Sequence, residues 1–368
     1  MHSLGIPTTR SLSLVSLPAL PVLRERVESA CVLTRVAPSF IRIGSFEALN
    51  PPEKMFFFGG GQQDAHWDSL RVLGEWVGQR VLKLQKIKWR DEANDEGDAW
   101  GRELVLEVAR RNARMVAGWQ AYGFMHGVIN TDKIFAVRAL LNALAPIIGA
   151  EAEQGTAVKA GWADDATPEK VDEWRKEGLK LLPEVEETIQ DTCADEYKKR
   201  IHKRLALRRI DLDDESKLAR PLLDLMAEHR LDFHSTFRRL AYFRLSMAET
   251  SQGTENNKEL DEYIQSVLTL TPEPQMVDQM KASTDLKAWL ERYAARIKSE
   301  REQWGDDIDA EREKASRAVN PRFVLRQWVL EEVIKKVEQD ADSGKRVLRK
   351  VLQLLKLDSN AALGSVRL

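Results

Sequence analysis

The regular alternation of apolar and polar residues that is typical of β-strands is confined to the first 46 residues of this chain. Residues 8–16 and 30–46 alternate in this way and are rich in β-branched side chains, so both are predicted to be strands. From residue 67 onward the apolar residues recur at helical spacing. The chain is therefore predicted to be mostly α, of the α+β class, with a short strand region before a large helical body.

The helical part is predicted to begin with a helix from about Trp67 to Trp89. The next predicted helix, at 101–122, places four apolar residues on one stripe: Leu104, Val108, Met115 and Trp119. Further helices are predicted at 134–148, 216–229, 232–248, 258–268 and 285–303.

Two positions combine a capping side chain with a proline at the first helical position. Thr167-Pro168 predicts the start of a long helix. Asn320-Pro321 predicts a second start. The residues after it form one apolar helical face: Leu325, Trp328, Val329, Val333 and Val337.

The charge balance gives no reason to expect a nucleic-acid or membrane-surface partner. The 368 residues include 56 Lys and Arg against 58 Asp and Glu, which leaves a net charge of −2. Such a chain has no overall field that attracts polyanions. No apolar run is expected to reach the roughly 18 residues that cross a bilayer. We therefore expect neither nucleic acid nor membrane as a partner.

The cysteines and histidines exclude several kinds of site. Cys31 and Cys193 lie far apart and have no CxxC partner, which excludes a disulfide framework and a thiolate zinc site. The six histidines show no HExxH or other paired spacing, so a metalloprotease is excluded too. A soluble protein in a reducing compartment fits this composition best.

The first 24 residues allow two interpretations. They contain Arg10, Arg24, several serines and no acid, which is the composition of a mitochondrial presequence. Pro7, Pro18 and Pro21 interrupt any amphipathic helix there. Composition alone does not decide whether these residues are a presequence or part of the folded protein.

Arg35 and Arg42 are seven residues apart in "TRVAPSFIRIG", an otherwise apolar segment interrupted by Pro38. Two guanidinium groups at this spacing can clamp phosphates, because each offers a planar fork of donors. Two surface arginines lying beside an edge strand explain the same pattern, and arginine is common there.

The segment "HGVINTD", which ends at Asp132, also has two interpretations. Asp132, six residues after His126, can be the carboxylate that orients or deprotonates an attacking hydroxyl in a kinase-type loop. Alternatively, Thr131 or Asp132 is the N-cap of the helix predicted from 134. The residues alone favour the cap.

Five segments taken together resemble one family, selenoprotein O, the kinase-like protein adenylyltransferases. They occur in the family's order and extend over most of residues 2–340. The matching segments are "LGIPTTRSLSLV" (4–15), "VLRERVESACVLTRVAPSFIRIGSFE" (22–47), "GFMHGVINTD" (123–132), "HSTFRRL" (234–240) and "VNPRFVLRQWVLEEVIKKVEQ" (319–339). The resemblance makes residues 1–24 an internal segment of the family instead of a presequence.

The resemblance implies a protein-kinase-like fold that uses ATP and Mg²⁺ to transfer AMP to Ser, Thr or Tyr hydroxyls of other proteins, whose identity it leaves unknown. It implies that Arg35 and Arg42 contact phosphates and that Asp132 is catalytic. In domain terms it implies small-lobe strands at 1–48, a helical C-lobe at 49–340, and a C-terminal helix and tail at 341–368. Because eukaryotic members are mitochondrial, it also implies a mitochondrial location.

Two departures from the family pattern concern the metal. The family has an Asn after the catalytic Asp and a DYG motif soon afterwards, and both supply magnesium ligands. Here Lys133 stands at the Asn position, no DYG occurs, and no Asp lies between Asp132 and Asp164. The glycine loop, small-lobe Lys and helix Glu of the family cannot be placed either.

We therefore expect an N-terminally truncated member with an internal deletion, whose adenylyltransfer is absent or vestigial. The alternatives are a catalytically dead, pseudokinase-like remnant that binds proteins, and a fragment produced by an incorrect gene prediction.

Overall fold

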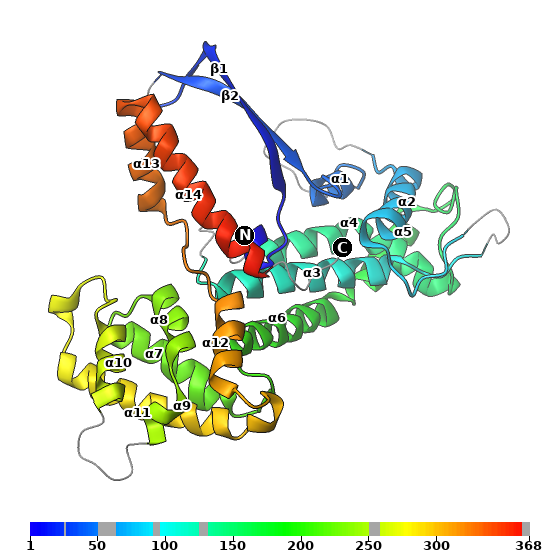
Figure 1. Cartoon of the computed structure of the whole chain (residues 1–368). Coiled ribbons are helices and arrows are strands. Elements are labelled where there is room, and N and C mark those ends of the chain that lie inside the picture. The colour runs from blue at the N-terminus through cyan, green and yellow to red at the C-terminus, as the bar shows by residue number, and fades with distance from the viewer. Residues whose placement is uncertain (26, 51–63, 91–95, 125–131, 250–257, 363–368) are drawn as a thin grey trace. The chain divides into compact units, whose positions relative to one another are not determined.

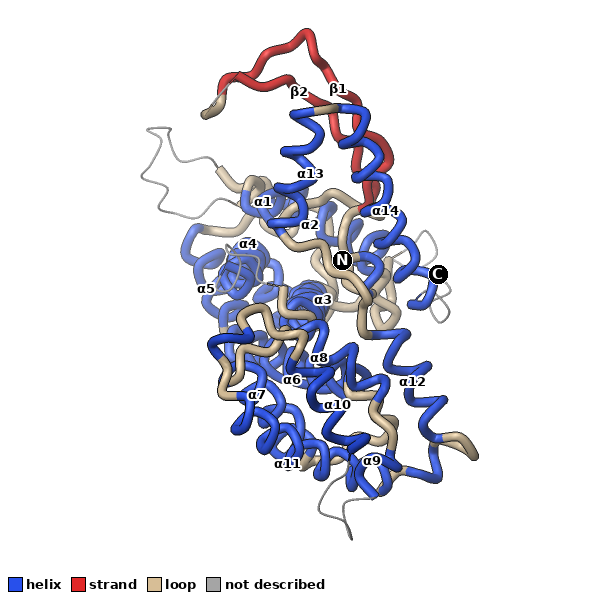
Figure 2. Tube along the Cα trace, turned by 60° about the vertical axis from the view of Figure 1, so that its left-hand side comes forward, coloured by secondary structure: helices blue, strands red, loops and turns tan. Residues whose placement is uncertain are grey.

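The computed structural model describes the chain except for six places: 26, 51–63, 91–95, 125–131, 250–257 and 363–368. The described residues are mostly helical, and their one sheet is two-stranded (Figure 2). This confirms the prediction of a mostly α chain with a short strand region. The chain divides into two compact units, each described here by itself.

The N-terminal unit comprises Thr8–Ala117 and Met125–Asp195. The C-terminal unit comprises Met1–Pro7, Gly118–Phe124 and Glu196–Leu368. The domain boundaries predicted at residues 48 and 340 stay predictions.

Among its described residues, the N-terminal unit contains two strands, four whole α-helices and parts of two more, which can be followed in Figure 1. In chain order they are β1 (Arg10–Leu23), β2 (Val27–Val36), α1 (Ile43–Glu47), α2 (Trp67–Trp76) with the π-helical η2 (Val77–Leu82), most of α3 (Gly101–Ala121), α4 (Asp132–Gln154), α5 (Pro168–Leu179) and the start of α6 (Leu182–Arg204).

The C-terminal unit contains the ends of α3 and α6 and a series of shorter helices. These are η1 (His2–Leu4), η3 (Glu215–Ala219), α7 (Arg220–Glu228), α8 (Phe233–Arg239), η4 (Leu240–Tyr242), α9 (Leu245–Glu249), α10 (Lys258–Leu268), η6 (Pro274–Met276), α11 (Gln279–Lys298), η7 (Arg301–Gln303), α12 (Ile308–Val319), α13 (Gln327–Gln339) and α14 (Ala341–Ala362).

Both predicted strands exist, but their ends differ from the prediction. β1 and β2 pair antiparallel, and β1 continues to Leu23 through a register shift between Leu17 and Pro21. β2 ends at Val36 instead of residue 46, because Pro38 has no N–H for a ladder hydrogen bond. The remaining predicted strand residues turn into helix α1.

The first long helix ends earlier than predicted. Instead of continuing to Trp89, the helix formed by α2 and η2 ends at Leu82. Lys83 follows with a φ of 55°, a left-handed conformation that terminates a helix. The helical spacing of apolar residues continues beyond Lys83 in the sequence, but the helix itself does not.

α3 confirms the helix predicted at 101–122, although another face is buried. Leu104 is fully buried, but the other three residues of the predicted stripe are only half-buried. The buried face consists mainly of small residues: Ala109, Ala113, Ala117 and Ala121. Small side chains let neighbouring helices approach closely, but alanine contributes little to a hydrophobicity pattern, so the pattern points to another face.

α4 and α5 cross at close range in the core of the N-terminal unit. A Cβ added at Gly149 would lie 1.9 Å from the carbonyl oxygen of Trp174, and one at Gly178 would lie 2.1 Å from that of Ala145. Only glycine fits at both contacts. α5 begins as predicted, with the Thr167 side chain accepting a hydrogen bond from the Lys170 backbone N–H.

α4 is more apolar than the sequence interpretation allowed. Within the described residues, Phe135–Gln154 is one stretch long and apolar enough to cross a bilayer, with a mean hydropathy of 1.4. However, 67% of its most apolar window is buried. Val137, Leu140, Leu144 and Ile147 belong to the core of the N-terminal unit.

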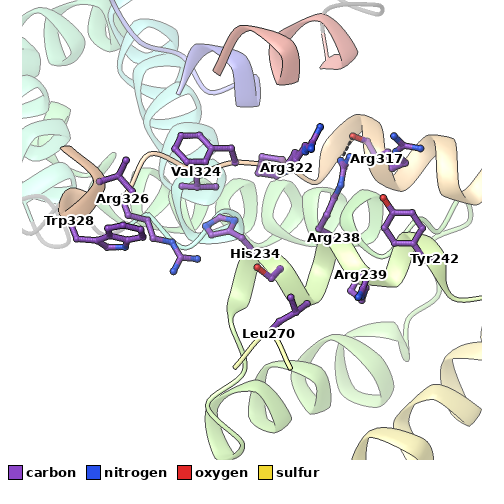
Figure 3. A pocket seen from close by; sticks show the side chains of 14 residues that line it. His234, Arg238, Arg239, Tyr242, Leu270, Arg317, Arg322, Val324, Arg326 and Trp328 are labelled. Atoms are coloured by element: carbon purple, nitrogen blue, oxygen red, sulfur yellow. Dashed lines mark hydrogen bonds between the residues drawn. The ribbon is translucent and has the colours of Figure 1, made fainter. Parts of the chain in front are cut away.

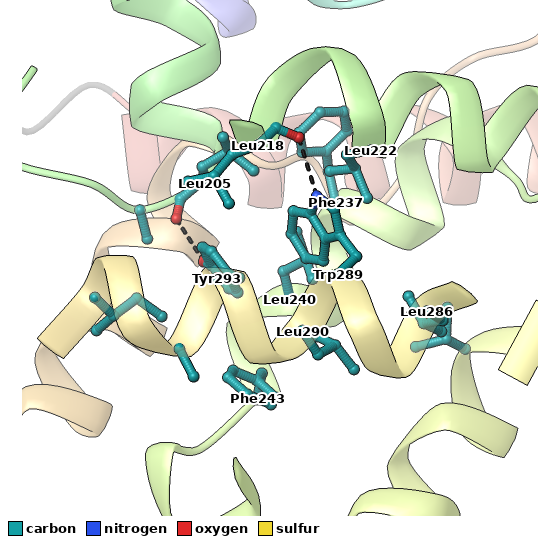
Figure 4. Close-up of a cluster of buried hydrophobic side chains, with 14 of the residues drawn as sticks. Leu205, Leu218, Leu222, Phe237, Leu240, Phe243, Leu286, Trp289, Leu290 and Tyr293 are labelled. Carbon is teal, nitrogen blue, oxygen red and sulfur yellow. Dashed lines mark hydrogen bonds between the residues drawn. The ribbon is translucent and has the colours of Figure 1, made fainter. Parts of the chain in front are cut away.

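The core of the C-terminal unit gathers side chains from α6, η3, α7, α8, α10 and α11. Figure 4 shows the part of this core that surrounds Trp289 and Tyr293 of α11. Trp289 is fully buried, and its indole N–H donates to the carbonyl oxygen of Leu218 at 3.0 Å. The buried Tyr293 hydroxyl donates to the carbonyl oxygen of Leu205. The large aromatic rings are thus buried with their polar atoms satisfied.

Several helix predictions in this unit need correction. α10 has the predicted bounds, but the helix predicted at 232–248 is divided into α8, η4 and α9. The one predicted at 285–303 is α11, which starts earlier because Asp278 is its N-cap. η3 and α7 occupy the helix predicted at 216–229.

Asn320-Pro321 does not start a helix. α12 ends at Val319, residues 321–326 are not helical, and α13 begins at Gln327. The Asn320 side chain is fully buried instead and makes tertiary hydrogen bonds. On the predicted apolar face, Val333 is buried but Trp328 is 61% exposed.

Candidate active site

Arg35 lies near the end of β2, where its Cα partner is Ser11 of β1. Its side chain is exposed, and its guanidinium carbon is 5.8 Å from the centre of the Phe40 ring. At this distance a cation–π contact at an exposed site contributes about 0.5 kcal/mol. Among the described residues Arg35 has no acidic partner, so its charge is available to an anion.

Arg42 is the N-cap residue of α1, with an extended backbone (φ −110°, ψ 154°). Its carbonyl oxygen accepts a hydrogen bond from the Ser45 N–H, while its own side chain is exposed. No ion pair to Arg42 occurs within the described part of the chain. The structure thus places both predicted phosphate-contacting arginines in the N-terminal unit, on the two sides of a short bend.

α1 is fixed to α4 by its buried face. Phe46 belongs to the core of the unit. Just after α1, the buried Asn50 side chain donates to the carbonyl oxygen of Ala143 at 2.8 Å. Because α4 begins at Asp132, the helix that follows Arg42 packs on the helix that carries the predicted catalytic Asp.

The predicted catalytic loop lies only partly in the described structure. Residues 125–131, including His126 and Thr131, are outside the described residues, and so are the side chains of Asp132 and Lys133. The backbone shows that α4 starts at Asp132 and stays helical to Gln154. The predicted apolar helix is therefore confirmed and begins two residues earlier than residue 134.

The next acidic residue in α4 is not free to act as a metal ligand. Glu151 is 2% exposed, and its carboxylate accepts hydrogen bonds from the backbone N–H groups of Gly101 (2.8 Å) and Trp100 (3.3 Å). It thereby caps the positive end of α3. Burial raises the pKa of Glu151 from its ordinary 4.5 to about 8, although these N–H groups act in the opposite direction.

These residues do not fit a magnesium site of the family's kind. Magnesium prefers oxygen ligands, usually with one or two carboxylates. After Asp132 the chain supplies an ammonium, Lys133, then an uninterrupted helix whose first acid is the buried Glu151. The donor set contains one candidate carboxylate and an adjacent positive charge.

The comparisons with known proteins agree on one family. A family model described as "Protein adenylyltransferase SelO" matches residues 1–139 and 166–355. The chain belongs to the SelO family. The matched ranges leave out 140–165, which include most of α4.

Individual relatives come from bacteria and eukaryotes. The protein nucleotidyltransferase YdiU of Bordetella petrii is 33% identical, over 91% of this chain and 62% of its own length. The mitochondrial protein adenylyltransferases SelO of Schizosaccharomyces pombe and Mus musculus are 28% and 26% identical. This SelO-family chain spans less than two thirds of the length of each of these relatives.

One feature of the structure had no role in the sequence interpretation. Two matched segments, 234–240 and 319–339, carry Arg238, Arg239, Arg322 and Arg326, and all four line one cavity of the C-terminal unit. The sequence shows arginines in both segments. Because the segments are about eighty residues apart, the sequence does not show that these arginines line the same cavity.

Proposed function

We propose that this chain is a SelO-family adenylyltransferase whose transfer of AMP from ATP to Ser, Thr or Tyr hydroxyls is absent or vestigial. The observation that carries the proposal is the start of α4. Asp132 is followed by Lys133 and by a helix with no acid before the buried Glu151.

The family resemblance assigns phosphate contacts to Arg35 and Arg42, and acceptance of the proton of the attacking hydroxyl to Asp132. The two exposed guanidinium groups have no acidic partner among the described residues, but without a bound metal ion they are not expected to hold the phosphates of ATP by themselves. A carboxylate at the attacking group provides general-base catalysis, typically about 10²–10⁴-fold in rate. These residues alone account for a small part of an enzymatic rate enhancement.

The larger part of the expected loss in the rate of AMP transfer comes from the missing metal ligands. A metal ion that clamps transferring phosphates supplies several kcal/mol of transition-state stabilisation, and each ~1.4 kcal/mol is a factor of ten in rate. Lys133 provides one positive charge but cannot reproduce the geometry of a bound cation. We therefore derive no magnesium-dependent step for this chain.

The test is incorporation of labelled AMP from ATP, with Mg²⁺ present, into the chain itself and into a mixture of proteins. The chain and its Asp132→Ala variant are expected to give the same background signal. Lys133→Asn restores the family's Asn but no second carboxylate, so it is expected to stay at background. A YdiU relative assayed in parallel shows that the assay works. Incorporation comparable to that of the YdiU relative, and abolished by Asp132→Ala, would overturn the proposal.

A protein-binding module is a second candidate function, and the β1–β2 hairpin favours it. Several of its apolar side chains are strongly exposed: Leu12, Leu14, Leu20, Leu23 and Val27, at 54–80%. Exposed apolar surface of this kind marks protein contacts, and an isolated hairpin is marginally stable. If Leu12→Ser and Leu14→Ser leave both solubility and oligomeric state unchanged by light scattering, this candidate loses its support.

The mitochondrial location is also a proposal. It rests on the names of the fission-yeast and mouse relatives, whereas those of the bacterial relatives state no location. Fractionation of the source cells, with an antibody against the C-terminal unit, tests it.

A further inference from the structure

A cavity of about 740 Å³ lies within the C-terminal unit, between α8 and the segment that joins α12 to α13 (Figure 3). Its volume is in the range of small-molecule sites. The described lining residues include no acid. They include five arginines: Arg238, Arg239, Arg317, Arg322 and Arg326. The cavity is therefore strongly positive.

The two walls of this arginine pocket are held together by a buried pair. Arg204, fully buried, donates to the Asn320 side-chain oxygen at 2.9 Å, and the Asn320 amide donates back to the Arg204 carbonyl at 2.8 Å. The Arg204 guanidinium lies 3.7 Å from the centre of the Phe237 ring of α8. Because these contacts are buried and reciprocal, the walls are preorganised before a ligand arrives.

Two of the lining arginines are positioned by neutral groups. Arg238 donates to the carbonyl oxygens of Arg317 (2.9 Å) and Asn320 (2.6 Å). Arg239 donates to the carbonyl oxygen of Ser266, and its buried Nε has no partner among the described residues. Carbonyl acceptors fix the direction of a guanidinium group but do not neutralise its charge.

The other three lining arginines differ in whether an acidic side chain neutralises their charge. Arg326 pairs with Asp232, and Arg317 pairs with Glu313. Arg322 is exposed and has no ion pair within the described residues. Arg238, Arg239 and Arg322 therefore leave an uncompensated positive charge around the cavity.

His234 adds a neutral hydrogen-bonding group to the same cavity. Figure 3 shows its ring between the arginines of α8 and those of the opposite segment. Its buried Nδ1 has no hydrogen-bond partner in the described part of the chain. Burial, together with the charge of Arg204, lowers the pKa of His234 to about 4, so the ring is neutral at pH 7. A neutral imidazole can donate to or accept from a ligand.

We propose that the arginine pocket binds a ligand with at least two linked phosphate groups. Linked phosphates present the several oxygen acceptors and the multiple negative charges that three uncompensated guanidinium groups can receive. Trp328, an exposed aromatic side chain at one end of the lining, can in addition stack on the base of a nucleotide (Figure 3). The site is separate in the chain from Arg35, Arg42 and Asp132, and the inference does not depend on AMP transfer.

The test is isothermal titration calorimetry of the full chain with inorganic tripolyphosphate at low and moderate salt. Arg239→Gln combined with Arg322→Gln removes two of the three uncompensated charges, and neither side chain takes part in the Arg204–Asn320 contacts. Arg292→Gln combined with Arg301→Gln is the matched control, because both residues are exposed and lie outside the lining. We expect binding near 1:1, weakened by at least about tenfold in the pocket variant and unchanged in the control.

The two sources of linked phosphates are separated by comparing ADP with pyrophosphate. Tighter binding of ADP that Trp328→Ala removes identifies a nucleotide, whereas equal binding identifies the phosphates alone, and both outcomes support the pocket. Absence of tripolyphosphate binding by a folded sample overturns the proposal. Equal weakening in the pocket and control variants, or loss of binding only in Arg35→Ala, overturns it as well.

Discussion

The two groups of arginines in this SelO-family chain differ in how they are held. Arg35 and Arg42, to which the family resemblance gives a role, are both exposed, Arg35 near the end of the two-stranded hairpin and Arg42 at the start of α1. Arg238, which no comparison assigns, is fixed by two carbonyl oxygens in a cavity whose walls are joined by buried hydrogen bonds. The difference indicates that the side chains of Arg35 and Arg42 contribute little to the free energy of folding, whereas that of Arg238 belongs to the packed C-terminal unit.

The largest expected effect contrasts a glycine of the α4–α5 crossing with one beside Arg42. Gly149→Ala would bring a Cβ to 1.9 Å from a backbone oxygen, whereas Gly44 has open space around it. We expect Gly149→Ala to lower the free energy of unfolding by about 3 kcal/mol or more. Gly44→Ala is expected to leave it unchanged or raise it by about 0.5–1 kcal/mol. Urea denaturation measures both, and similar losses would contradict the contrast.

The second prediction concerns the pair that holds the arginine pocket. Asn320→Ala leaves the Arg204 Nε–H and the Arg204 carbonyl without their buried partners. The expected loss in the free energy of unfolding is about 2 kcal/mol. Asn142→Ala, on the exposed side of α4, is the control and should change it by less than about 0.5 kcal/mol. A loss no larger than that of the control would show that the pocket walls are not held by this pair.

The third prediction is a pH dependence in the N-terminal unit. The Glu151 pKa is about 8 in the folded chain and 4.5 ordinarily, so folding binds a proton between these values. Stability should fall as pH rises from about 4.5 to 8, by at most about 1.4 kcal/mol per pH unit from this group, and level off above 8. Glu151→Gln should flatten the curve, while the exposed Glu187→Gln should not. Urea midpoints at several pH values measure the slope, and parallel curves for the chain and Glu151→Gln would contradict it.

The smallest effects are expected at the resemblance-derived arginines. Arg35→Ala and Arg42→Ala remove exposed side chains without an ion pair among the described residues. Each should change the free energy of unfolding by less than about 0.5 kcal/mol. Thermal denaturation checks this, and a loss above about 1 kcal/mol in either variant would mean that the replaced arginine is structural.

Local patterns predicted those elements whose ends are set by local chemistry. The Thr167 cap and the bounds of α10 follow from capping groups and periodicity within the segment itself. Asn320 misled the prediction because its side chain satisfies Arg204, more than a hundred residues away, instead of capping a helix. The strand predicted to residue 46 ends early because Pro38 cannot donate a ladder hydrogen bond, and Phe46 beyond it packs in the core as part of helix α1.

The candidate site was predictable to a different extent. Motif recognition located Arg35, Arg42 and Asp132, and their roles stay predictions. The arginine pocket was not predicted, because its arginines come from segments about eighty residues apart that only tertiary packing brings together.

The central claim is that this chain no longer supports the family's chemistry because the residues after Asp132 lack metal ligands, and calorimetry with magnesium-ATP tests it most directly. The chain and Arg35→Ala should give the same isotherm, since any phosphate binding should come from the arginine pocket and weaken by at least about tenfold in Arg239→Gln combined with Arg322→Gln. Binding that weakens tenfold or more in Arg35→Ala would contradict the claim and show that the phosphate clamp still functions.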